Sequence, residues 1–323
     1  MLEIRGLVKV YPGPVTALNG IDLDVAPGMF GLLGPNGAGK TTFMKILAGL
    51  LEPTSGTVTL DGNDILGHPE NLWPRLGYLP QEFGFYPHLT GEAMLAHLLD
   101  LKGVQAPGGR RKLVRDLLER VNLTFAAKRA VKNYSGGMRQ RLGIAQALAG
   151  DPRLIIVDEP TAGLDPEERL RFYHLLSELA VNRMVILSTH IVEDVAVLCP
   201  RFAVIRSGRL LALTSPSEAR GSIAGHIFEG TVLVEDLPKL REEHMVTQAL
   251  LVEGRNRARV YDPSGTPPIG FVPAPVTLED AYLVLMRLGA LPARGKRGGP
   301  SGEGAPATHD GSPHAAASIE AGR

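Results

Sequence analysis

The sequence predicts an α/β fold, and three features of the 323-residue chain lead to this prediction. An apolar run over residues 29–33 leads into a glycine-rich loop, and an apolar stripe with helical spacing follows it. A second apolar run, over residues 154–157, ends at two consecutive acidic residues, which is typical of a buried parallel strand. Between these regions, two stretches have helical apolar spacing. We therefore expect an α/β core interrupted by an inserted block of helices.

Length, charge and cysteine content limit the classes of protein that the chain can represent. Its length suffices for one large domain and a smaller one. The 34 basic and 34 acidic residues balance, which argues against nucleic acid as a partner. The single cysteine, Cys199, excludes an internal disulfide and suits a reducing compartment. The N-terminus has no apolar signal core and no window holds 18 apolar residues, so we expect no membrane crossing by this chain itself.

Two alternating apolar patterns, over residues 2–10 and 21–25, predict two half-buried strands at the start of the chain. Tyr11 lies between them, next to the turn residues 12–14. On the residues alone, an aromatic ring that fills a hairpin corner is favoured over one that stacks on adenine.

The glycine-rich loop matches the phosphate-binding pattern and has the strand and helix that this pattern requires on either side. Its members are Gly34, Pro35, Asn36, Gly37, Ala38, Gly39, Lys40, Thr41 and Thr42. Glycines let successive backbone N–H groups point at a triphosphate, and the helix N-terminus adds a positive field. Lys40 would bind the β- and γ-phosphates, Thr41 would ligate Mg²⁺, and Thr42 could reach the α-phosphate. The loop therefore predicts a nucleotide site.

A strand over residues 77–81 is expected to end at Gln81. A buried amide beside a nucleotide can bind the metal or position water, although a lone Gln is usually a surface residue. Three aromatic residues follow, namely Phe83, Phe85 and Tyr86. They could belong to the core of the next helices or form an exposed docking patch, and the residues themselves leave both open. Helices are expected over residues 90–101, with Thr90 as the cap, and over residues 110–121.

The sequence Ser135-Gly136-Gly137 precedes a helix over residues 139–149. Ser135 is a natural N-cap, and the two glycines leave the backbone bare at the helix start. This predicts a second anion-binding helix end.

Acidic and imidazole side chains follow two of the expected strands. Asp158 and Glu159 come directly after the apolar run at 154–157, and His190 follows another run at 184–187. Ligands bind at the carboxyl ends of strands in open α/β sheets. There Asp158 can hold Mg²⁺, Glu159 can activate the attacking water, and His190 can donate to a γ-phosphate.

Taken in order, these motifs resemble the ATP-binding cassette, the nucleotide-binding subunit of ABC transporters. The ordered set is Tyr11, the loop at residues 34–42, Gln81, Ser135-Gly136-Gly137, Asp158-Glu159, the Asp165 turn and His190. The resemblance covers residues 2 to 215 and implies a P-loop NTPase fold: a RecA-like mixed sheet, an antiparallel β subdomain and a helical subdomain at about residues 86–147. It also implies that Tyr11 contacts ATP, that Thr41, Gln81 and Asp158 hold Mg²⁺, and that Glu159, His190, Gln81 and Lys40 act in catalysis.

The resemblance further implies partners and a location. Ser135, Gly136 and Gly137 of one subunit would cover the γ-phosphate bound to Lys40 of a second copy, in a homodimer or a heterodimer with a related cassette. An integral membrane permease, encoded separately, would dock between the Gln81 loop and the helical block, which favours the docking reading of the aromatic cluster. The chain would lie on the cytoplasmic face of the membrane as a peripheral subunit of an exporter.

Two residues depart from the usual signature, in which Leu precedes the Ser and Gln follows the glycines. Tyr134 and Met138 occupy these positions. Because Met has no amide to donate or accept a hydrogen bond, we expect altered affinity or coupling with activity kept. The form of this motif resembles that of single-cassette bacterial exporters.

Beyond residue 215 the patterns weaken. Residues 216–290 are compatible with a small α/β accessory domain whose last helix begins at Thr277, and residues 291–323 have the composition of a disordered tail. Two alternatives to transport stay open. One is a cassette that signals to a membrane partner, and the other is a soluble ATPase that acts on ribosomes or DNA; the balanced charge and single cassette speak against the latter.

Overall fold

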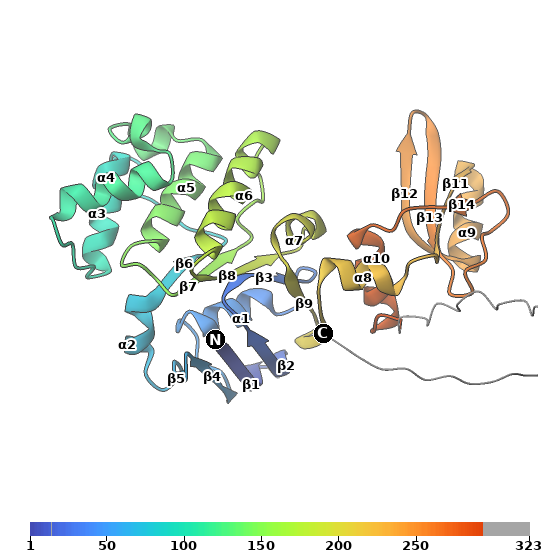
Figure 1. The fold of residues 1–323 in the computed structure, drawn as a ribbon, viewed down its shortest axis with the longest axis horizontal. Coiled ribbons are helices and arrows are strands. Elements are labelled where there is room, and N and C mark those ends of the chain that lie inside the picture. The colour runs from blue at the N-terminus through green and yellow to red at the C-terminus, as the bar shows by residue number, and fades with distance from the viewer. Residues whose placement is uncertain (14, 293–323) are drawn as a thin grey trace, which may run out of the picture.

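A computed structural model describes residues 1–13 and 15–292 (Figure 1). The tail expected over residues 291–323 lies outside the described residues from residue 293 onward. The central sheet has six strands in the order β10-β9-β3-β8-β7-β6. Their bounds are β3 Gly28–Leu33, β6 Leu76–Leu79, β7 Leu154–Asp158, β8 Met184–Thr189, β9 Arg201–Arg206 and β10 Arg209–Thr214. All are parallel except β10, which runs antiparallel to β9. The prediction of a mixed α/β sheet is confirmed.

A second, antiparallel sheet has the order β2-β1-β4-β5. Its strands are β1 Leu2–Tyr11, β2 Val15–Val25, β4 Ser55–Leu60 and β5 Asn63–Asp64. The alternating side chains of β1 that predicted a strand, such as Leu2 and Ile4, are fully buried. They share one core with the inner face of helix α1, Lys40–Leu47, and with one face of the central sheet. This shared core fixes the phosphate loop between the two sheets.

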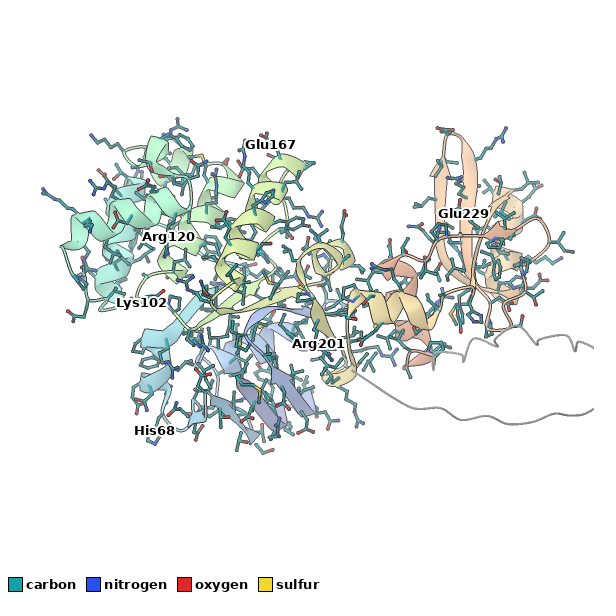
Figure 2. The ribbon with its side chains drawn as sticks, viewed as in Figure 1. His68, Lys102, Arg120, Glu167, Arg201 and Glu229 are labelled. Carbon is teal, nitrogen blue, oxygen red and sulfur yellow. The ribbon has the colours of Figure 1, made fainter. Side chains whose placement is uncertain are left out.

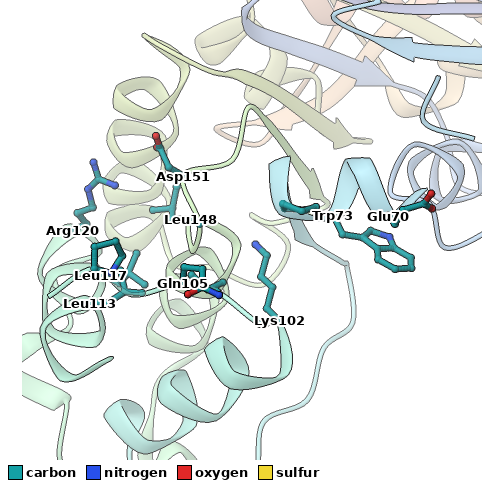
Figure 3. A pocket seen from close by; sticks show the side chains of 14 residues that line it. Glu70, Trp73, Lys102, Gln105, Leu113, Leu117, Arg120, Leu148 and Asp151 are labelled. Atoms are coloured by element: carbon teal, nitrogen blue, oxygen red, sulfur yellow. The ribbon is translucent and has the colours of Figure 1, made fainter. Parts of the chain in front are cut away.

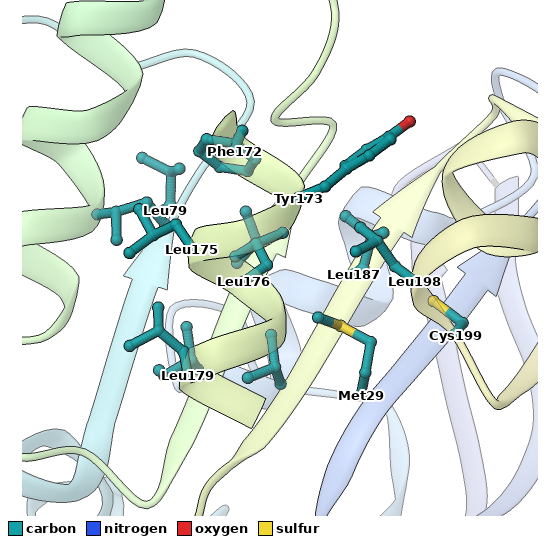
Figure 4. Packing of buried hydrophobic residues seen from close by; sticks show 14 of the residues in the cluster. Met29, Leu79, Phe172, Tyr173, Leu175, Leu176, Leu179, Leu187, Leu198 and Cys199 are labelled. Atoms are coloured by element: carbon teal, nitrogen blue, oxygen red, sulfur yellow. The ribbon is translucent and has the colours of Figure 1, made fainter. Parts of the chain in front are cut away.

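The other face of the central sheet is covered by helices. Their bounds are α3 Gly91–Leu101, α4 Arg110–Arg120, α5 Gly136–Ala147, α6 Pro166–Ala180 and α7 Val192–Leu198. Figure 4 shows the inner side of α6, including Phe172, Leu176 and Leu179, over the strands that carry Met29 and Leu187. The two helices predicted at residues 90–101 and 110–121 are confirmed, and Thr90 caps the first by accepting from the backbone N–H of Ala93.

Short helices connect these elements. They are α2 Pro69–Leu72 and the 3-10 turns Trp73–Arg75, Thr124–Ala126 and Val131–Asn133. Among the described residues, no helix combines the length and apolar character required to span a bilayer.

A third sheet, with the order β12-β13-β11-β14, follows the central one in the chain. Its elements are α8 Pro216–Ser222, β11 Ile227–Val232, the 3-10 turn Val234–Asp236, α9 Leu237–Glu243, β12 Met245–Val252, β13 Arg255–Tyr261, β14 Val272–Pro273 and α10 Leu278–Leu288. Thr277 caps α10 in a capping box with Asp280. Helix α10 packs on α7 and α8 as well as on β12, so it links this sheet to the central one. Figure 2 shows Glu229 on this third sheet, far from Arg120 on the helical block.

Candidate functional site

The phosphate loop leaves β3 at residue 34 and ends where α1 begins at Lys40. Two of its glycines are required by space and backbone geometry. Gly39 has φ of 106°, and a Cβ there would lie 2.5 Å from the carbonyl oxygen of Ala17. A Cβ on Gly34 would lie 2.4 Å from the carbonyl oxygen of Ile205. The loop backbone therefore passes so close to the Ala17 and Ile205 segments that these two positions have no room for a side chain.

Parallel strand register brings three of the predicted catalytic residues together. Leu33 pairs with Thr189, and Ser188 pairs with Asp158, so the chain segments that follow β3, β7 and β8 meet at one sheet edge. There Lys40 Nζ lies 3.3 Å from Glu159 Oε1, and His190 Nδ1 lies 2.6 Å from Glu159 Oε2.

Glu159 is held firmly in this arrangement. Its side chain is 6% exposed, and its backbone has φ of 50°, a left-handed conformation that is uncommon for a non-glycine residue. The Glu159 backbone N–H donates to the Ser188 carbonyl at 2.8 Å. Lys40, whose side chain is 5% exposed, also donates to the Gly34 carbonyl at 2.8 Å. Glu159 therefore lies between two groups that can carry positive charge, where a water and a γ-phosphate could meet it.

Asp158 has the environment expected of a ligand for a divalent cation. Its side chain is buried, and neither carboxylate oxygen has a hydrogen-bond partner among the described residues. Burial raises the pKa of Asp158. The hydroxyls of Ser188 and Thr41 lie near enough to oppose this rise in part, but neither is placed for a hydrogen bond. Such an unpaired buried carboxylate beside Thr41 fits the oxygen ligands that Mg²⁺ prefers.

A cavity of about 350 Å³ opens over the phosphate loop. Its lining consists of Val15, Thr16, Ala17, Asn36, Gly37, Ala38, Gly39, Lys40, Thr41, Thr42, Gln81 and Glu159. Val15, Thr16 and Ala17, which belong to β2, were not predicted to line the site. No sequence motif indicates that this strand lies next to the phosphate loop. Gln81 reaches the cavity although β6 ends at Leu79; the predicted strand was two residues too long, because Pro80 lacks the N–H for a further ladder bond.

Tyr11 is not among the residues that line this cavity, but it lies next to the loop. Its hydroxyl is 3.5 Å from Thr42 Oγ1, and Lys9 Nζ lies 5.3 Å from the centre of its ring. The ring is therefore placed at the rim of the loop, beside a cation.

The second predicted anion site is separate from the first within this chain. Ser135 caps α5 by accepting from the Met138 backbone N–H at 3.1 Å, and Ser135 and Gly136 are exposed. Neither they nor Gly137 line the cavity over the phosphate loop. Gly136 instead lines a second cavity of about 360 Å³ together with Gln81 and the turn at residues 162–164. A Cβ on Gly137 would lie 2.4 Å from Glu168 Oε2, so a side chain there would displace the Glu168 carboxylate where α5 meets α6.

The two unusual signature residues point into the protein. Tyr134 is 3% exposed and donates from its hydroxyl to the Ala126 carbonyl at 2.9 Å, and Met138 is 7% exposed in the same core. The expected effect of Met138 on nucleotide affinity or coupling stays a prediction. These side chains pack the helical block beneath the exposed Ser135 and Gly136.

The aromatic cluster after Gln81 does not form one exposed patch. Phe83 and Phe85 pack edge to face, with ring centroids 5.2 Å apart, and both contact the main core. Tyr86 alone is largely exposed, at 60%, and its ring lies beside His97. Phe83 and Phe85 are half-buried against this core, and a role of the cluster in docking a membrane partner stays a prediction.

Comparisons with known proteins agree with this site. A family model described as ABC transporter matches residues 18–162. The chain is 39% identical over 244 residues to the Nod factor export ATP-binding protein I of Ralstonia nicotianae, covering 75% of each protein. It is 34% identical over 291 residues to ABC transporter A family member 10 of Arabidopsis thaliana, covering 87% of this chain but only 31% of that protein's length.

The chain is also similar to a solved structure of an ATP-binding cassette. It is a dimeric ATP-binding cassette in a post-hydrolysis state bound to ADP and phosphate. The match has a TM-score of 0.60 at 26% identity and covers 67% of this chain and 98% of that one.

Proposed function

Because this chain belongs to the ABC transporter family, we propose that it is the subunit that binds and hydrolyses ATP to drive export through a separate integral membrane permease. The observation that carries the proposal is the position of Glu159 between Lys40 and His190, next to Asp158, whose carboxylate has no hydrogen-bond partner among the described residues. This arrangement supplies a base for water and groups for a γ-phosphate at one edge of the sheet.

Each residue has a distinct task in hydrolysis. Lys40 and the loop backbone bind the phosphates, and Glu159 accepts the proton of the attacking water. His190, which is hydrogen-bonded to Glu159, orients this base and would face the γ-phosphate of a bound ATP. Thr41, Asp158 and Gln81 would hold Mg²⁺, which when bound neutralises charge on the β- and γ-phosphates.

The separate signature site points to a second copy of the subunit. Ser135 and Gly136 present an exposed N-terminus of the 12-residue helix α5 that the phosphate loop of the same chain does not use. A head-to-tail dimer would place this helix end over the γ-phosphate bound by Lys40 of the partner. The related cassette of known structure is dimeric, which supports the same assembly here.

For the permease we propose docking in a large groove beside the helical block, whose lining does not include the Gln81 loop expected from the resemblance. It has a volume of about 900 Å³ and lies where α2 and the turn after it face the ends of α3, α4 and α5 (Figure 3). Its lining is partly apolar, including Trp73, Leu113 and Leu148, and Lys102 lies at its floor. Lys102 Nζ donates to the carbonyls of Leu76 and Ala149, so it joins the helical block to the central sheet. A permease helix in this groove would hold the subunit at the cytoplasmic face of the membrane.

Two measurements test the proposal. The purified chain should release phosphate from ATP only with Mg²⁺ present, and Lys40→Ala should abolish ATP binding. Co-expressed with the membrane protein of the neighbouring reading frame, the chain should co-purify with it. Changing Trp73, which is 50% exposed, to Ser should weaken this association, whereas Phe125→Ser, at an aromatic that is 67% exposed and outside the groove, should not.

The results separate the alternatives. Absence of ATP hydrolysis by wild type with its partner present would refute the enzymatic role. Hydrolysis without any membrane partner would favour a soluble cassette ATPase, and association without solute movement would favour signalling to a membrane protein.

A further inference from the structure

A buried carboxylate, Asp194, lies close in the chain to His190 and has no role in the hydrolysis described above. Asp194 lies on α7, four residues after His190, and is fully buried. Its Oδ2 accepts hydrogen bonds from Thr161 Oγ1 at 2.5 Å and from Thr189 Oγ1 at 3.1 Å. Its Oδ1 accepts from Arg169, at 2.6 Å from the nearer guanidinium nitrogen, and from the Tyr173 hydroxyl.

The donors come from three different segments of the site. Thr161 follows Glu159 by two residues, and Thr189 immediately precedes His190. Arg169 and Tyr173 belong to α6, whose N-cap is Asp165. One carboxylate thus joins the turn after β7, the end of β8 and the helix that begins at the Asp165 turn.

This convergence matters because the turn that carries Glu159 is not a relaxed one. Glu159 adopts φ of 50°, which persists only where the surroundings impose it. On one side the turn is fixed by the bond from Glu159 N–H to the Ser188 carbonyl. On the other side it is fixed by Thr161, which Asp194 holds. Thr189 is fixed in the same way and in turn accepts from the Ile191 backbone N–H at 2.9 Å, just after His190.

We propose that Asp194 is a positioning residue for ATP hydrolysis: through Thr161 and Thr189 it sets the distance between Glu159 and His190. This inference rests on the proposed ATPase function. Asp194 itself touches neither the nucleotide cavity nor the reacting groups, so it acts only through these two threonines.

The test removes one threonine hydroxyl at a time and leaves the carboxylate in place, because Asp194→Asn would also leave Arg169 without its ionic partner. Thr161→Val and Thr189→Val keep the side-chain shape. The matched control is Thr247→Val, since Thr247 Oγ1 likewise donates to a buried aspartate, Asp280 at 2.7 Å, in the third sheet. That aspartate is also bound by an arginine, so the two sites have the same chemistry.

Misplacing a catalytic group by about 1 Å can cost about 100-fold in rate. We therefore expect Thr161→Val and Thr189→Val to lower kcat about 10- to 100-fold, with the KM for ATP within about twofold of wild type. Thr161→Ser, which restores the hydroxyl, should recover most of kcat. Thr247→Val should lose a similar amount of thermal stability but keep kcat. In the double variant Thr161→Val with Thr189→Val, the loss should be smaller than the product of the single losses.

A second readout does not depend on turnover. In protein with ¹³C-labelled histidine, the Cε1 resonance of His190, assigned by its loss in His190→Ala, should shift in both threonine variants and stay unchanged in Thr247→Val. If wild type proves inactive, the ATPase proposal fails, while this resonance still decides whether Thr161 and Thr189 set the position of His190. Unchanged His190 resonance in both variants, or kcat losses no larger than in Thr247→Val, would overturn the role of Asp194.

Discussion

The substitution Glu159→Gln probes the reacting end of the site. It keeps the shape of the side chain but removes the base that accepts a proton from water. A positioned general base contributes about 10²- to 10⁴-fold to rate, which at 1.36 kcal/mol per tenfold corresponds to about 3–5 kcal/mol of transition-state stabilisation. We expect turnover to fall by this factor while ATP binding and dimer closure persist.

The fold should survive this change, although with a measurable loss. Glu159 contacts Lys40 at 3.3 Å and His190 at 2.6 Å, and a Gln side chain keeps one acceptor oxygen for these two groups. One buried contact is therefore lost, which costs about 1–3 kcal/mol of unfolding free energy. The left-handed backbone at this position is no worse for Gln than for Glu.

The assay combines phosphate release under single-turnover conditions with size-exclusion chromatography in the presence of ATP and Mg²⁺. Glu229→Gln is the control, because Glu229 also pairs with cations, Arg257 at 3.2 Å and Arg259 at 2.9 Å, on the third sheet. Turnover of Glu159→Gln within threefold of wild type would refute the assignment of the base. A variant that binds ATP yet stays monomeric would refute the head-to-tail arrangement.

Three further predictions concern stability. Gly91→Ala places a Cβ 1.9 Å from the Tyr134 hydroxyl and should lower the free energy of unfolding in urea by about 1–3 kcal/mol. In a chain that also carries Tyr134→Phe, the cost of Gly91→Ala should be smaller. If the costs of the two substitutions simply add, the clash is contradicted. Burial lowers the pKa of Lys102 to about 8. Between about pH 8 and 10.4 the unfolded chain therefore binds more protons than the folded chain, and the free energy of unfolding should rise with pH across that window by up to about 3 kcal/mol. Lys102→Met should remove this rise, and an unchanged slope would show that other groups cause it. Arg259→Met leaves the buried Asp280 without its partner at 2.7 Å and should cost about 3–5 kcal/mol in unfolding of the C-terminal sheet, whereas a loss below about 1 kcal/mol would mean that Asp280 is protonated or hydrated there.

Local patterns were sufficient for much of the architecture. The phosphate loop, the apolar run before Asp158 and the caps at Thr90, Ser135 and Thr277 depend on neighbours within a few residues, and the strands and helices they predict are present. The end of β6 was predicted at Gln81 but lies at Leu79, because Pro80 has no N–H to continue the strand ladder.

Aromatic side chains show where pattern reasoning reached its limit. Whether Phe83 and Phe85 are core or surface depends on which helix packs over them, and that is a contact between distant segments. The same holds for Tyr134 and Met138, whose burial in the helical block depends on the segments that pack against them.

Patterns along the chain were enough to identify the chemical groups and to place Asp158, Glu159 and His190 at the carboxyl ends of strands. How these groups meet is a property of the folded chain. Glu159 contacts both Lys40 and His190, neither Asp158 oxygen has a hydrogen-bond partner among the described residues, and Asp194 accepts from donors in three segments. Such contacts depend on hydrogen bonds and burial, which act over a few ångströms between residues far apart in the chain. Sequence patterns record only the periodicity and chemistry of near neighbours, so they cannot specify such distances.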